Sequence, residues 1–367
     1  MFQAAKRLTE VASGGLGYRV GGDVFALLVP TDEQHEPTYM ASLVSDKMKD
    51  AWAVDSHQVN MPTTTVSLRF ADRDWTSEGI ISRAEFALAR GKAAEREIVI
   101  FDDKMAALYE HQASLEATMQ KAVEQRRFET WFQPIMNLAT GRFDTAEALI
   151  RLRDESGDLV RPDEFIPLAE TSELIGSLTW IVLEDSCRLL SSGKAPELKR
   201  VSVNLTARQL LQRDLARKAI ELIKCYGLEP HQIKFEITER TVAENPDIVA
   251  ETMAQLSEMG FDFMMDDFGT GYSNLSSALN MPFASVKLDK SLVDNITTDD
   301  RSRMMCELLV PFFHHLGQTV VAEGIETKEQ VEAAVEQGVD FIQGYYYARP
   351  MDREALVEWY GRGENGR

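Results

Sequence analysis

From residue 128 onward, short apolar runs alternate with longer stretches whose apolar residues recur at helical spacing. Many of the runs are rich in β-branched and aromatic side chains, which is typical of buried strands. The predicted strands are 131–136, 143–151, 200–205, 233–237, 261–266, 285–288, 319–322 and 341–343. Helices are predicted between most of them, at 167–192, 215–226, 247–259, 301–316 and 328–337. Strands that alternate with crossover helices favour a (β/α)8 barrel of the α/β class, and an open doubly wound sheet is the alternative.

The first hundred residues have the pattern of a separate, small α/β unit. We predict a helix at 2–11, a hairpin at 18–29 around Gly21-Gly22, a strand at 63–70, a helix at 80–94 and a strand at 97–101. Residues 103–127 contain neither Gly nor Pro, so a continuous helix is expected there. The predicted domains are therefore a unit at 1–103, a linker helix at 104–127, a barrel at 128–360 and a frayed tail at 361–367.

Composition restricts the classes of partner. The chain has 367 residues, 44% of them hydrophobic, so it can bury a sizeable core. It carries 59 acidic and 39 basic residues, a net charge of −20, which argues against DNA or RNA polymers as partners. The cysteines, Cys187, Cys225 and Cys306, have no metal-binding spacing and are expected to be reduced. With no signal peptide or membrane-length apolar run, we expect a cytoplasmic protein; a membrane or sensor segment upstream of residue 1 stays open.

Polar side chains stand in or at the ends of most of the predicted strands. They are Glu147, Asn204, Glu236, Asp266 with Asp267, Lys287, Glu323 and Gln343. In a barrel such strand ends converge on one mouth, where active sites lie. Each residue alone is more often a salt-bridged or solvated group. So many polar groups at one face are hard to explain by structure alone, because burying them unpaired is costly.

These side chains suit a site for two divalent cations. Carboxylate and amide oxygens are the ligands of Mg²⁺ or Mn²⁺, and no His or Cys cluster competes. Asp266 and Asp267 are adjacent at a strand end, so one of them can bridge two ions. Two such cations bind a phosphodiester and neutralise the charge that develops on it. Lys287 then orients the nucleophile or stabilises charge, and Glu323 or Asp267 accepts the proton.

The same motifs resemble those of the EAL-domain phosphodiesterases, which hydrolyse cyclic di-GMP. The likeness runs from about residue 115 to 358 and includes Glu147-Ala148-Leu149-Ile150-Arg151. It continues through residues 132–135, 165–170, 202–205, 235–239, 266–271, 286–289, 322–327 and 343–345. The resemblance implies a barrel whose first strand is antiparallel to its neighbours. It also implies hydrolysis of cyclic di-GMP to linear pGpG with two Mg²⁺ or Mn²⁺ ions, and inhibition by Ca²⁺.

The resemblance assigns roles to named positions. One ion is held by Glu147, Asn204, Glu236 and Asp266, and the other by Asp266, Asp267 and Glu323. The catalytic candidates are Lys287, Glu323, Asp267 and Glu147. The positions that contact the dinucleotide or support the site are Gln133, Arg151, Asp289, Glu326 and Gln343. Glu239 anchors the loop after Asp267, which in this family couples dimerisation to activity, so a homodimer through the barrel is expected.

Two alternatives to an enzymatic function are open. A catalytically silent receptor for cyclic di-GMP is the first alternative to an enzyme, but such receptors lose metal ligands that this chain keeps. A regulatory protein that acts through partner contacts, with catalysis incidental, is the second. Leu292, where many relatives have Phe, is expected to be neutral.

Near the N-terminus, Gly21-Gly22-Asp23-Val24-Phe25 resembles the signature hairpin of GGDEF diguanylate cyclase domains, and residues 66–68 and 83–92 continue the likeness.

That N-terminal likeness is degenerate. Val24 replaces an acid and cannot ligate a hard cation. The strand that carries the family's other metal ligand is missing, and Ala12 and Gly15 stand where the inhibitory RxxD motif has Arg and Asp. We therefore expect no cyclase activity from residues 1–103. A scaffold or remnant is one interpretation, and a unit that binds GTP is the other.

Overall fold

The computed structural model describes residues 2–11, 15–30, 36–50, 52–54, 57–70, 73–172, 174–212, 214–244, 246–269, 279 and 281–362. The chain divides into two compact units, Met1–Leu115 and Glu116–Arg367. Three predicted features fall wholly or partly outside the described residues: Ala12 of the inhibitory motif, most of the loop after Asp267 (270–278), and positions 363–367 of the tail.

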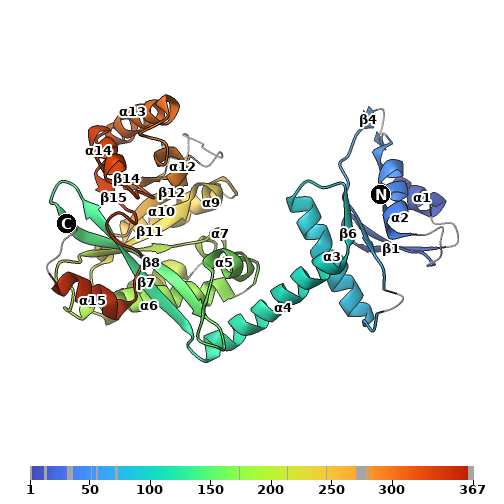
Figure 1. Cartoon of the computed structure of the whole chain (residues 1–367), viewed down its shortest axis with the longest axis horizontal. Coiled ribbons are helices and arrows are strands. Elements are labelled where there is room, and N and C mark those ends of the chain that lie inside the picture. Colours follow the sequence, from blue (N-terminus) through green and yellow to red (C-terminus); the bar gives the residue numbers. More distant parts are fainter. Residues whose placement is uncertain are drawn as a thin grey trace. The chain divides into compact units, whose positions relative to one another are not determined.

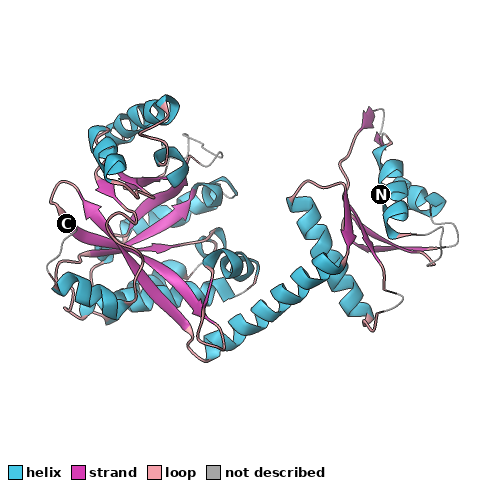
Figure 2. Cartoon of the chain, in the orientation of Figure 1, coloured by secondary structure: helices cyan, strands magenta, loops and turns pink. Residues whose placement is uncertain are grey.

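Eight strands of the second unit close into a barrel (Figures 1 and 2). They are β7 (Phe128–Asn137), β8 (Arg142–Arg153), β10 (Arg200–Asn204), β11 (Ile233–Thr238), β12 (Asp262–Phe268), β13 (Ser285–Leu288), β14 (Thr319–Ala322) and β15 (Phe341–Ile342). Strands β10 to β15 pair in parallel, β8 pairs in parallel with β10, and β7 is antiparallel to both β8 and β15. The predicted barrel with an antiparallel first strand is confirmed, and the open-sheet alternative is wrong. The short strand β9 (Leu159–Val160) pairs with β8 outside this ring.

Helices link the strands of the barrel. They are α5 (Pro162–Thr171), α6 (Leu174–Ser191), α7 (Ala207–Leu210), α8 (Leu215–Cys225), α9 (Glu239–Glu244), α10 (Pro246–Glu258), α12 (Lys290–Val293), α13 (Asp300–His315), α14 (Lys328–Glu336) and α15 (Arg353–Gly361), with a 3-10 turn at Pro230–Gln232. The single helix predicted at 167–192 is wrong, since α5 and α6 are separate. Ser172 has extended backbone angles, and its Oγ accepts a hydrogen bond from the Leu174 N–H, so it ends one helix and caps the next.

Strand alternation separates two apolar layers in the barrel. Outward-facing residues such as Val203, Phe235 and Val286 are fully buried in the main hydrophobic core. A small second cluster is formed by Ile135, Met264 and Val321, against which Phe341 packs. Met264 shares a strand face with Asp266, because residues two apart on a strand point the same way. The apolar cluster therefore lies beside the polar side chains of the predicted site.

The first unit contains the predicted hairpin. Its elements are α1 (Phe2–Val11), β1 (Leu16–Gly21), β2 (Val24–Leu28), α2 (Pro37–Lys49), β3 (Trp52–Val54), β4 (His57–Val59), β5 (Thr65–Leu68), α3 (Ser77–Ala93) and β6 (Ile98–Phe101). β1 and β2 are antiparallel, and Gly22 in their turn has a φ of 51°, which favours glycine. The elements α2, β3 and β4 were not predicted.

The predicted continuous helix is α4 (Asp103–Glu124), and the boundary between the two compact units falls inside it. It ends three residues earlier than predicted, where Arg126 takes a φ of 53° that stops the helix. Among the residues the structure describes, no single helix is long and apolar enough to cross a membrane; α5 and α6 pass that test only together, as a bent pair.

Candidate functional site

A buried lysine lies at the centre of the predicted site. Lys287 on β13 is 1% exposed, and its Nζ lies 3.0 Å from Glu147 Oε2 and 2.9 Å from Glu236 Oε2. The same Nζ lies 3.4 Å from Asp266 Oδ1 and 3.8 Å from Glu323 Oε2. These acids come from β8, β11, β12 and the residue after β14, so the barrel brings together groups far apart in the sequence. We call these five residues the Lys287 cluster.

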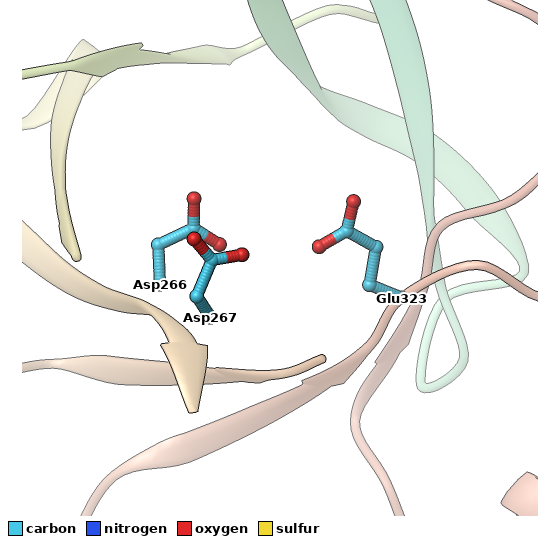
Figure 3. Close-up of side chains that lie close together, drawn as sticks. All are labelled: Asp266, Asp267 and Glu323. Atoms are coloured by element: carbon cyan, nitrogen blue, oxygen red, sulfur yellow. The ribbon is translucent and has the colours of Figure 1, made fainter. Parts of the chain in front are cut away.

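Two adjacent carboxylates reach this cluster because β12 is irregular. The register of β12 against β13 shifts between Met265 and Phe268, and Asp267 has a φ of 56°. This bulge interrupts the strand alternation that would send neighbouring side chains to opposite faces. Carboxylate oxygens of Asp266, Asp267 and Glu323 all lie within 4.8 Å of one another. In Figure 3 the first two stand side by side and face Glu323.

Three amide side chains surround Glu147. Asn204 Nδ2 donates to Glu147 Oε1 at 3.0 Å, and Gln343 Nε2 donates to Glu147 Oε2 at 2.6 Å. Gln343 also donates to Gln133 Oε1, and Gln133 in turn donates to the carbonyl of Ala348. Gln133 and Gln343 were predicted to contact the dinucleotide or support the site; this chain of hydrogen bonds favours the supporting role.

The other predicted contact residues have different partners. Arg151 is half-buried, donates to the Ile150 carbonyl and lies over the Trp131 ring, with its Cζ 5.5 Å from the centroid. Asp289 caps α12 through the Ser291 N–H, and Glu326 forms an ion pair with Lys290. This contact with Trp131 was not predicted, although the pairing of β7 with β8 brings the strands of the two residues side by side.

Glu239 is buried and begins α9, directly after β11. The loop that it is predicted to anchor spans 268–275, most of which lies outside the described residues, so this role stays a prediction.

Burial raises the proton affinity of several acids in the site. It raises the pKa of Glu236 to about 8, with a further contribution from the Glu147 carboxylate. It also raises the pKa of Glu323 to about 7, and, together with the Asp266 carboxylate, that of Asp267 to about 6. Burial raises the pKa of Asp266 as well. The site therefore holds carboxyl groups that exchange protons near neutral pH.

The pKa values of Lys287 and Glu147 shift in the opposite direction to the shift that burial alone would give. Burial disfavours the charged form of each. The surrounding carboxylates outweigh it at Lys287 and raise its pKa well above 10.5. The Lys287 ammonium, with hydrogen bonds from Gln343 and Asn204, holds the pKa of Glu147 below its usual value. These two residues therefore stay a charged pair across the physiological range.

The donor set fits hard divalent cations. Glu236 Oε1 and Asp266 Oδ1 are buried acceptor atoms with no hydrogen-bond partner among the described residues. Lys287 donates to the other oxygen of Glu236, so Glu236 Oε1 is left for a metal ion, whereas Asp266 Oδ1 lies 3.4 Å from Lys287 Nζ. The remaining candidates, Glu147, Asp267 and Glu323, are also carboxylates, which Mg²⁺ and Mn²⁺ prefer. An acidic site with buried, unsatisfied oxygens is thus suited to bind metal ions.

Comparisons with known proteins agree with these motifs. Residues 116–350 match the family model described as the EAL domain. The chain is 30% identical over 345 residues to the cyclic di-GMP phosphodiesterase NbdA of Pseudomonas aeruginosa, covering 93% of this chain and 44% of that protein. It is 28% identical over 347 residues to the cyclic di-GMP phosphodiesterase PdeR of Escherichia coli, covering 94% and 52%. The chain thus spans about half the length of these curated relatives.

Solved structures give the same result for the barrel. A structure described as "PaMucR Phosphodiesterase, c-di-GMP complex" is 30% identical, with a TM-score of 0.62, and covers 66% of this chain and 99% of that one. An EAL domain protein from Listeria monocytogenes EGD-e is 26% identical, with a TM-score of 0.60, and covers 67% and 98%. The family match begins at residue 116, so the likeness of the first unit to GGDEF domains stays a prediction.

Proposed function

The chain belongs to the EAL domain family, and we propose that its barrel hydrolyses cyclic di-GMP to linear pGpG. The observation that carries this proposal is the Lys287 cluster, joined by Asp267 at the β12 bulge. The cluster supplies carboxylate oxygens that can ligate metal ions, and a buried ammonium, at the mouth of the barrel. These are the groups that hydrolysis of a phosphodiester requires. The names of NbdA and PdeR as cyclic di-GMP phosphodiesterases support the same substrate.

We assign one cation to Glu147, Asn204, Glu236 and Asp266, and a second to Asp266, Asp267 and Glu323. The metals are Mg²⁺ or Mn²⁺. When bound, two such cations neutralise charge on the phosphodiester and activate the attacking water. Asp266 contributes to both sets, and one of its carboxylate oxygens lies within 4.8 Å of carboxylate oxygens of Asp267 and Glu323.

The protein's own side chains carry out the remaining steps. Lys287 keeps its proton and donates hydrogen bonds that orient the nucleophile or stabilise charge. Glu323 or Asp267, which both lie beside the proposed second cation, accepts the proton released by the nucleophile. Gln343 and Gln133 hold Glu147 in place. Arg151, Asp289 and Glu326 contact the dinucleotide.

A silent receptor for cyclic di-GMP is the competing function. It would bind the dinucleotide in the same barrel without cleaving it. Equilibrium dialysis and chromatography on the same samples separate the two. An enzyme releases pGpG in Mg²⁺ and only binds the dinucleotide in chelator, whereas a receptor returns intact cyclic di-GMP in both conditions.

We also propose that two chains pair through the barrel. Helix α13 exposes Met304 (59%), Met305 (43%) and Leu308 (63%), and an apolar face of this kind is stabilised by burial against a second copy. Light scattering during gel filtration tests this, with Leu308→Asp as the variant expected to give monomers. A wild-type chain that stays monomeric at high concentration would contradict the proposal.

The first unit is proposed to be an inactive GGDEF-like scaffold or regulator, with GTP as the ligand of the alternative. Val24 begins β2 beside the hairpin turn, where it offers no oxygen to a metal. We place the protein in the cytoplasm, since Cys187, Cys225 and Cys306 are free thiols and Cys225 is exposed. Thiol labelling of the protein in intact and lysed cells tests this placement.

A further inference from the structure

The one-turn helix α12 (Lys290–Val293) follows directly from the strand that carries Lys287. Its cap, Asp289, accepts a hydrogen bond from the Ser291 N–H at 2.9 Å, which fixes where the helix begins. Two side chains of α12 pack against glycines, and each glycine comes shortly after an acid of the proposed metal centre.

Leu292 makes the first of these contacts, with Gly269. A methyl group on Gly269 would lie 2.4 Å from Leu292 Cδ1, so the leucine packs directly on the glycine backbone. Gly269 has a φ of 109°, a value that favours glycine, and it lies two residues after Asp267. Leu292 therefore contacts the backbone directly after β12, just beyond the bulge that turns the Asp267 side chain into the site.

Lys290 makes the second contact, with Gly324. A methyl group on Gly324 would lie 2.6 Å from Lys290 Cγ and 2.7 Å from Lys290 Cβ, so the stem of the lysine lies against this glycine. Gly324 has a φ of 78° and follows Glu323 directly. The charged end of Lys290 pairs with Glu326, away from that contact. The aliphatic stem is thus the part of Lys290 that contacts Gly324, the residue directly after Glu323.

Backbone hydrogen bonds join the same two strand ends to the segment before α12. The Asp289 N–H donates to the Phe268 carbonyl at 3.2 Å, and the Glu323 N–H donates to the Leu288 carbonyl at 3.2 Å. Residues 288–292 are therefore in contact with the backbone beside Asp267 on one side and beside Glu323 on the other.

We propose that α12 is a positioning element that sets the separation of Asp267 and Glu323. Leu292 on Gly269 and the Lys290 stem on Gly324 hold the two carboxylates at the spacing that the second cation requires. Neither side chain touches the metal or the substrate. This inference rests on the proposed role of Asp266, Asp267 and Glu323 as ligands of that cation. It assigns Leu292 a role in the site, where sequence comparison alone suggests a neutral position.

The test is a titration of the full chain with Mn²⁺ in the absence of substrate. The electron paramagnetic resonance signal of free Mn²⁺ measures how much of the metal is bound. The wild type is expected to bind two ions per chain. Leu292→Ala and Lys290→Ala are each expected to weaken one of the two ions about tenfold, as residues that orient metal ligands do, and to leave the other unchanged. Lys290→Met is the matched control: it keeps the stem against Gly324, loses the charge, and is expected to bind both ions as the wild type does.

Two further variants keep the result interpretable. Leu292→Val removes less volume, so it is expected to fold even if Leu292→Ala does not, with a smaller loss at the same ion. In a Glu323→Gln background, where the second ion is already lost, Leu292→Ala is expected to leave the remaining ion unaffected.

Several outcomes would overturn the inference. If Leu292→Ala, Leu292→Val and Lys290→Ala all bind Mn²⁺ with the wild-type affinities, α12 has no positioning role. Equal weakening of both ions, with a lower unfolding temperature, would give α12 a purely structural role. A wild type that binds fewer than two Mn²⁺ ions would contradict the proposed metal centre itself, a failure distinguishable from that of α12.

Discussion

Lys287 Nζ lies 3.0 Å from Glu147 Oε2 inside the barrel, and both side chains are almost completely buried. Removing one partner of such a pair leaves an uncompensated buried charge and typically costs about 3–5 kcal/mol. We therefore expect Lys287→Met to lower the free energy of unfolding by about that amount in chelator, measured in urea at neutral pH. Lys290→Met, at a half-exposed ion pair, is the control, with an expected cost below about 1 kcal/mol. Equal stability of Lys287→Met and wild type would show that the acids do not need this ammonium.

Lys287→Met should also reduce turnover more than substrate affinity, because the ammonium acts in the chemical step. Steady-state kinetics separate the two effects. A higher KM with an unchanged kcat would assign Lys287 to substrate binding instead.

Gln343 and Glu147 give a second prediction. Glu147→Ala and Asp266→Ala each remove a proposed metal ligand and should abolish measurable turnover. Gln343→Ala leaves the proposed ligands in place but removes the hydrogen bonds to Glu147 and Gln133, so a loss of about ten- to a hundredfold in kcat is expected. Gln330 is a matched control, since it is also a buried glutamine, but its Oε1 accepts from the Thr327 N–H in the capping box of α14. Gln330→Ala should reduce stability and leave kcat near the wild-type value. Full activity in Gln343→Ala would refute its supporting role.

The raised pKa values predict how stability depends on pH. Glu236, Glu323 and Asp267 have folded-state pKa values of about 8, 7 and 6, above the value near 4 that carboxyls have in unfolded chains. Between those limits the folded state binds more protons than the unfolded state, so the free energy of unfolding falls as pH rises. Glu147 has the opposite shift, but it affects stability only in more acidic solution.

In chelator, stability should therefore fall from about pH 6 to pH 8, as measured by urea unfolding. Mg²⁺ competes with the same protons, so it should stabilise the protein more at the higher pH. Glu236→Gln should flatten the slope in chelator. A stability that rises over this range would contradict the raised pKa values of these three carboxyl groups.

The first unit provides a fourth prediction, the absence of cyclase activity. The intact chain with Asp266→Ala should be incubated with GTP and Mg²⁺, because that variant would not degrade any cyclic di-GMP formed. No cyclic di-GMP should appear by chromatography, since Val24 offers no ligand to a metal. Accumulation of the dinucleotide would overturn the interpretation of this hairpin.

Strand periodicity predicted eight strands alternating with helices, but it left an open doubly wound sheet as the alternative, and the antiparallel first strand was expected only from the resemblance to EAL domains. It also predicted that Glu147, Glu236, Asp266, Lys287 and Glu323 would converge. It could not predict the backbone of Asp267, since a left-handed φ of 56° depends on the bulge that tertiary pairing imposes. The break at Ser172 was missed for a related reason: neither Gly nor Pro marks it, and the cap is made by a serine hydroxyl.

Contacts between distant segments were also beyond the sequence pattern. The packing of Leu292 on Gly269 depends on how α12 lies against β12, which residue spacing along one strand does not specify. The hydrogen bond from Gln343 to Glu147 joins strands on either side of β7 and needs the closed ring.

Hydrolysis of cyclic di-GMP by the intact chain tests the central claim most directly. Product formation should be followed by chromatography in Mg²⁺, Mn²⁺, Ca²⁺ and chelator, with Asp266→Ala as the blank. We expect pGpG to appear first in Mg²⁺ or Mn²⁺ and chelator to abolish it, and we expect Ca²⁺, whose coordination is longer and looser, to support little turnover. Intact cyclic di-GMP in every condition would make the barrel a receptor, and full turnover in Ca²⁺ or chelator would contradict the two-cation site.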